Sequence, residues 1–169
     1  MTYFVADSIM FLSVGLLLIA GLHDAAARTI PNWIPASLAA AGLVLRVQQG
    51  NAVTGIMVAV LLISLLGLLL RRGFIGGGDM KLIPAVALLL PPSRTPALVL
   101  SVAIAGGVLA LIYLTFSFIV RRPAPGPRQG LLARVCKAEA WRMHRRGPLP
   151  YALAIAGGAL PIFINTLSR

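Results

Sequence analysis

The chain is poor in acidic, cysteine and histidine residues. It has four acidic side chains among 169 residues, one cysteine (Cys136) and two histidines (His23 and His144). A single cysteine excludes an internal disulfide and a multi-cysteine zinc site, and two distant histidines give no metal-binding pattern, so no metal or cofactor is expected. Neither a serine–histidine–carboxylate arrangement nor an H-E-x-x-H motif is present. Acid–base chemistry is therefore left to very few carboxylates.

Long apolar runs account for the low charge. Hydrophobic residues make up 59% of the chain and charged residues 11%, with a mean hydropathy of +0.92. About 20 apolar residues in a helix cross a bilayer. Six apolar segments can be drawn, at 4–22, 33–47, 52–70, 80–90, 97–120 and 149–167. The sequence predicts an all-α, polytopic membrane protein with about six transmembrane helices in a single domain, 1–169, and the lipid bilayer as its surroundings.

Two of these segments need comment. The N-terminus lacks a basic region and a convincing cleavage site, so residues 8–22 are expected to remain as a first span rather than to be removed as a signal peptide. The segment 80–90 is short for a span. It either crosses a thinned or water-filled region or re-enters on the same side.

The net charge of +11 does not indicate nucleic-acid binding, because the basic residues lie in the connections between apolar runs. Lys and Arg prefer cytoplasmic loops. If all six segments cross, most of the 15 basic residues fall on one side together with Asp24 and Asp79, which predicts a cytoplasmic location for both and an external N-terminus. The largest loop, 121–148, contains a stretch at 131–143 that fits a short basic helix on the membrane surface or a solvated, topology-setting loop.

The first aspartate directly follows the first apolar segment, in the sequence His23-Asp24-Ala-Ala-Ala-Arg28-Thr29-Ile30-Pro31-Asn32. Ionisable groups at membrane level are costly and indicate function by default. Pro31 forbids a continuous helix, and Asn32 is expected to cap the second one. The alternative interpretation of Asp24 is a simple interfacial pair with Arg28 at i,i+4.

The second aspartate follows three glycines, in Gly76-Gly77-Gly78-Asp79-Met80-Lys81. Glycines leave room for an approaching peptide backbone and permit unusual conformations. The fourth helix is expected to begin just after Asp79, so that the helix N-terminus favours its ionised form. A plain turn with Asp79 as helix cap is the alternative. Lys81 is expected either to bias the local charge or to meet lipid phosphate.

Together these motifs resemble the two active-site signatures of type IV prepilin peptidases, which are GxGD-type intramembrane aspartyl proteases. Residues 150–157 are similar to the P-Y-x-x-A-I-A segment of that family. The resemblance implies Asp24 and Asp79 as the catalytic pair. Mutual repulsion is expected to raise the pKa of one of them, and because the helix end near Asp79 opposes that rise, Asp79 is expected as the base. The residues expected to bind or position the substrate are Gly76, Gly77, Gly78, Lys81, Pro31 and Asn32.

The resemblance also implies a biological setting. It predicts cleavage of the leader peptides of prepilins or pseudopilins at a prokaryotic cytoplasmic (inner) membrane, with the active site facing the cytoplasm and the pilus assembly machinery as a further partner. The chain is similar in size to the short, peptidase-only members found with tight-adherence (Flp-type) pili. It shows no N-terminal four-cysteine region, so methyltransferase activity is not expected.

Two other functions fit parts of the pattern. A small transporter or channel could use the two aspartates as a proton or cation relay, which ion flux without peptide cleavage would reveal. A non-catalytic assembly subunit could retain the same fold, although it would not need both aspartates and the glycine run together.

Overall fold

The computed structural model describes residues 2–119 and 149–167, and within these ranges the regular secondary structure is all helical, as predicted. The helices are α1 (Thr2–Ala27), α2 (Trp33–Gln48), α3 (Ala52–Arg71), α4 (Gly77–Leu89), the 3-10 turn η1 (Pro92–Arg94), α5 (Thr95–Ile119) and α7 (Tyr151–Leu167). Most of the basic loop 121–148, including the candidate helix 131–143 and Cys136, lies outside the described residues.

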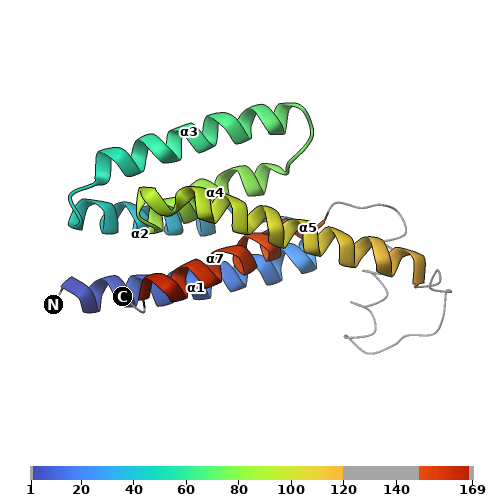
Figure 1. Cartoon of the computed structure of the whole chain (residues 1–169), viewed down its shortest axis with the longest axis horizontal. Coiled ribbons are helices and arrows are strands. Elements are labelled where there is room, and N and C mark those ends of the chain that lie inside the picture. Colours follow the sequence, from blue (N-terminus) through green and yellow to red (C-terminus); the bar gives the residue numbers. More distant parts are fainter. Residues whose placement is uncertain (1, 120–148, 168–169) are drawn as a thin grey trace.

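The helices form a bundle in which α4 is central (Figure 1). It packs against α2 and α3 on one side and against α7 on the other, while α1 and α5 pack against α7. Three stretches are long and apolar enough to cross a membrane: Ala6–Ala27, Ala52–Arg71 and Pro92–Phe116. The membrane-protein prediction is thereby confirmed. Many large apolar side chains on α3 and α5 are exposed on the outside of the bundle, as expected of helices that face lipid.

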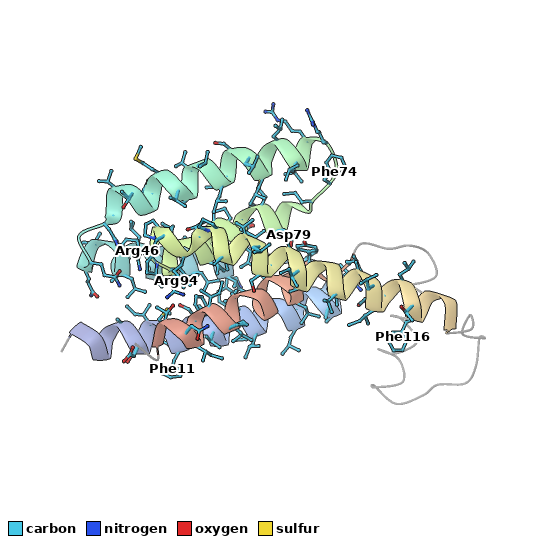
Figure 2. The ribbon with its side chains drawn as sticks, viewed as in Figure 1. Phe11, Arg46, Phe74, Asp79, Arg94 and Phe116 are labelled. Carbon is cyan, nitrogen blue, oxygen red and sulfur yellow. The ribbon has the colours of Figure 1, made fainter. Side chains whose placement is uncertain are left out.

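The short fourth segment runs through the bundle and does not fold back. Its 13 residues give a helix of about 20 Å at 1.5 Å per residue. Asp79 lies toward the end of the bundle marked by Phe74, whereas Arg46 and Arg94 lie at the opposite end (Figure 2). This arrangement agrees with the six-helix prediction and leaves the fold-back alternative without support.

The packing around α4 is close because small residues face it. A Cβ atom added at Gly42 of α2 would lie 2.7 Å from the carbonyl carbon of Leu88, so a larger residue there would push the two helices apart. Most of the α4 side chains from Leu82 onward are buried. The position of Asp79 is consequently tied to a tightly held helix.

Arg46, from α2, binds the carbonyl groups at the C-terminal end of α4. Its side chain is only 1% exposed; Nε donates to the Leu88 carbonyl oxygen at 3.1 Å and an Nη atom donates to that of Leu89 at 3.4 Å. The last carbonyls of a helix lack partners within the helix, and a cation near them is favoured by the helix dipole. The sequence showed Arg46 only as an interruption of an apolar run; the structure gives it a partner.

Candidate active site

Asp24 lies three residues before the C-terminal end of α1 and points into the bundle. It is 7% exposed, and its Oδ2 accepts a hydrogen bond of 3.0 Å from the backbone N–H of Ala152. Ala152 belongs to the first turn of α7, where free N–H groups and the positive end of the helix dipole favour an anion. A negative charge on Asp24 is therefore stabilised by α7, a helix that starts 127 residues later in the sequence.

The chain leaves α1 through a tight turn. Arg28 has a left-handed φ of +56°, and its N–H donates to the Asp24 carbonyl oxygen at 2.8 Å. The ring Nδ1 of His23 donates to the Thr29 carbonyl at 2.7 Å. The Arg28 guanidinium lies 5.8 Å from the Tyr113 ring centre and donates to the Tyr113 hydroxyl at 3.3 Å. The Arg28 guanidinium therefore contacts Tyr113 of α5. The helical pair of Asp24 and Arg28 stays an alternative interpretation.

Asp79 is the third residue of α4. The helix begins at Gly77, before Asp79 and not after it as expected from the sequence. The Asp79 Oδ2 accepts a hydrogen bond of 3.3 Å from the N–H of Gly76, the residue that precedes α4, so the carboxylate lies next to the N-terminus of the helix. Only Gly76 among the three glycines has an extended backbone, with φ −81° and ψ 152°, because Gly77 and Gly78 form the first turn.

Two contacts join the segments that carry the aspartates. A Cβ atom added at Gly78 would lie 2.9 Å from Cδ1 of Ile30, so the missing side chain lets the turn after α1 pack against the start of α4. Nearby, the Lys81 ammonium donates to Oδ1 of Asn32 at 2.9 Å. Asn32 does precede α2, but its side chain makes no cap hydrogen bond. The prediction that the Asn32 side chain caps α2 is therefore wrong. Lys81 was expected to bias the local charge or to meet lipid phosphate, and its ammonium group binds the Asn32 amide oxygen.

Both aspartates line one cavity of about 520 Å³. Its wall comes from the end of α1 and the turn after it, the α3–α4 connection, the start of α4 and the start of α7. The lining residues are Asp24, Arg28, Thr29, Ile30, Gly73, Phe74, Ile75, Gly76, Gly77, Gly78, Asp79, Leu149 and Tyr151. Phe74 is 73% exposed at the tip of the α3–α4 connection (Figure 2). No described atom lies within 4 Å of a Cβ added at Gly77, so this position is open.

Most of the residues singled out in the sequence meet here. Asp24, Asp79 and the three glycines form part of the wall, while Asn32 and Lys81 brace the same two segments from beside it, with Pro31 in the turn between them. Sequence reasoning assigned no role to Phe74, and it noticed Tyr151 only within the family-like segment. The exposed aromatic next to a glycine run was the available signal for Phe74.

The two carboxylates influence each other. Burial and, second, the negative charge of Asp24 raise the pKa of Asp79 from its usual 3.8 to about 6, while the Gly76 N–H acts in the opposite direction. Burial penalises the charged form, and a neighbouring like charge does the same. Asp79 thus keeps its proton to a higher pH than an ordinary aspartate does. The expectation from the sequence weighed the mutual repulsion of the pair against the helix end near Asp79 and took Asp79 as the base, but it did not include the burial of Asp79.

The site has the groups that acid–base hydrolysis requires. Among the described residues, no cluster of three or more His, Cys, Asp or Glu side chains could hold a metal ion. An ionised carboxylate beside a protonated one can activate a water molecule and polarise a carbonyl group. The pair therefore suits hydrolysis of a peptide bond.

Comparison with known protein families identifies a match that includes both aspartates. A sequence model of the type IV leader peptidase family matches residues 11–111, which include both aspartates and most of the cavity wall. No curated protein and no solved structure matches the chain. The family's substrates are prepilins, and the apolar helices of this chain make it a membrane protein. Since the match covers more than half of the chain, this protein belongs to the type IV leader peptidase family.

Proposed function

We propose that this protein is an intramembrane aspartyl endopeptidase that cleaves the leader from Flp-type prepilins, with residues 1–169 forming a single peptidase domain. The observation that carries the proposal is the shared cavity, in which Asp24 and Asp79 face the same space and the charge of one raises the pKa of the other. A pair of carboxylates that holds one proton is the basis of aspartyl protease chemistry.

The environments of the two carboxylates suggest their roles. Asp24, with the Ala152 N–H on its Oδ2, is the ionised base that takes a proton from water as the water oxygen attacks the scissile carbonyl carbon. Asp79 donates its proton to the carbonyl oxygen, which gives a tetrahedral diol. When the C–N bond breaks, Asp24 gives its proton to the leaving nitrogen, and Asp79 recovers one from the diol. Both carboxyl groups then return to their starting states.

Substrate access is consistent with these roles. The open position at Gly77 and the extended backbone of Gly76 leave space for a peptide backbone next to Asp79. Because Gly77 and Gly78 are helical, strand-like pairing with the substrate is limited to the stretch that ends at Gly76. Phe74, exposed at the tip of the connection, is placed to contact the leader.

We place the cavity on the cytoplasmic side of a prokaryotic inner membrane. The cavity lies at the end of the bundle where α3 ends and α4 and α7 begin. The chain between α5 and α7 contains the basic sequence 121–148. Basic connections favour the cytoplasmic side. A prepilin leader is cytoplasmic before cleavage, so the scissile bond would reach the aspartates at the membrane boundary.

The test is processing of a co-expressed Flp-type prepilin, scored by its mobility shift. Wild type should cleave it, and Asp24→Asn and Asp79→Asn should each lower the rate by at least about 100-fold, the range typical for loss of a positioned acid or base. Asp7→Asn is the matched control, since Asp7 lies on α1 far from the cavity wall. Cleavage that survives in either cavity variant would remove that residue from the mechanism. Ion flux through vesicles without any cleavage would favour a relay instead.

A further inference from the structure

A second hollow lies between α3 and Met80 at the start of α4. It has a volume of about 410 Å³ and is lined by Ile63, Ser64, Gly67, Leu68, Leu70, Arg71 and Met80, which we call the α3–α4 groove. Resting on the proposed function, we propose that this groove binds the apolar helix that follows the leader in the prepilin. The groove would hold the substrate in the membrane while the leader junction reaches the aspartates.

The residues that line the groove and those that line the catalytic cavity are neighbours in sequence on both sides. On α3 the groove ends at Arg71, two residues before Gly73 of the cavity; on α4 it ends at Met80, directly after Asp79. A helix lying in the groove would therefore direct its end toward the aspartates. Such continuity is required of a substrate whose scissile bond is joined to a membrane-embedded helix.

The shape of the groove suits a helix. Its α3 residues recur at three- and four-residue spacing from Ile63 to Arg71, which places them along one face over about 12 Å. Gly67 lies on this face, and a Cβ added there would meet only Met80 Cε, at 3.5 Å, among the described atoms. Small residues let the backbones of membrane helices approach closely. A partner helix can thus sit against α3 at Gly67.

The chemistry of the groove suits an apolar partner. Ile63 and Leu68 are exposed along it, and the hydroxyl of Ser64 already donates to the Val60 carbonyl at 2.9 Å. An apolar helix would leave that donor satisfied, so no unpaired polar group would be buried. Arg71 stands at the end of the groove nearest Gly73 of the cavity. In Figure 1, α3 lies along the edge of the bundle, so a membrane helix can reach it laterally.

Photo-crosslinking tests contact directly. Full-length protein carrying Asp24→Asn, with benzoylphenylalanine in place of Ile63, is incubated in liposomes with an intact Flp-type prepilin. The same probe at Val108 on exposed α5 is the matched control. A prepilin adduct from position 63 that exceeds the one from 108 by about tenfold would support the proposal, because tenfold corresponds to a clear binding preference. Equal adducts, or adducts with lipid alone at position 63, would overturn it.

Filling the groove tests its contribution to turnover. In an otherwise wild-type enzyme, Gly67→Leu should lower the ratio of kcat/KM for the intact prepilin to kcat/KM for a leader-junction peptide without the apolar helix, by about tenfold. Gly107→Leu on α5, where a side chain meets open space, should leave this ratio as in wild type. An unchanged ratio in Gly67→Leu would overturn the proposal.

The two proposals can fail separately. A position-63 adduct with prepilin, from a protein whose wild type cleaves no prepilin, would overturn the proposed function and leave the groove assignment standing. Prepilin cleavage by the wild type, without a preferential adduct at position 63, would overturn the groove assignment and leave the proposed function standing.

Discussion

Replacing Asp24 by asparagine should lower the pKa of Asp79, because the substitution removes the like charge that contributes to its rise. In the intact protein, burial is the larger cause, the Asp24 charge the second and the opposing Gly76 hydrogen bond the smallest. Removing the second cause while the first still exceeds the third should leave the pKa below about 6 but not below its usual 3.8. The direction and both limits follow from the order of the causes.

The size of the effect bears on catalysis. With a pKa of about 6, Asp79 is protonated in about one molecule in ten at pH 7, whereas at 3.8 the fraction would be below about one in a thousand. The raised pKa thus makes the acid form about 100-fold more available near neutral pH. In the wild-type enzyme, kcat/KM should accordingly decline as the pH rises above about 6.

The chain is well suited to the measurement. Asp7, Asp24 and Asp79 are its only aspartates, so selective ¹³C labelling of aspartate carboxyls gives three resonances in the wild type and two in Asp24→Asn. Asp7→Asn assigns the remaining signal and serves as the control that should not move the Asp79 titration. A wild-type Asp79 that titrates near 3.8, or one that does not shift in Asp24→Asn, would refute the electrostatic coupling of the two carboxyls.

Three further predictions concern stability and positioning. Because folding raises the pKa of Asp79, its ionisation costs stability as the pH rises through about 6; Asp79→Asn should therefore raise the thermal midpoint by about 2–4 °C at pH 8 and not at pH 3.5, and an equal rise at both would contradict this. Arg46→Met should cost about 2–4 kcal/mol in SDS-titration unfolding, since it leaves buried carbonyls of α4 without a donor, and Arg46→Lys should recover only part. Asn32→Ala, Lys81→Ala and the double variant should slow processing equally, because both residues act through one contact, and additive losses would show separate roles.

Local sequence features determined much of the fold. The lengths of the apolar runs predicted six helices, and the family-like motifs marked Asp24 and Asp79 as residues that meet. One error arose because a residue's partner lies far away in sequence. Asn32 fits a helix cap by its local position, but Lys81, 49 residues later, takes its amide oxygen. The start of α4 was misplaced because the Gly76–Asp79 hydrogen bond lets glycines begin a helix that their propensity disfavours.

The sequence by itself determined that the protein enters the membrane and indicated which carboxylates are candidates for its chemistry, because apolar length and the cost of a charge in lipid are properties of each segment alone. Only the tertiary structure decided how the carboxylates differ: α7 supplies the N–H that stabilises the charge of Asp24, and burial beside Asp24 lets Asp79 keep a proton. It likewise decided that Arg46 binds the last carbonyls of α4 and that a hollow lies between α3 and Met80 of α4. These properties depend on distances between segments, which the packing of the helices sets.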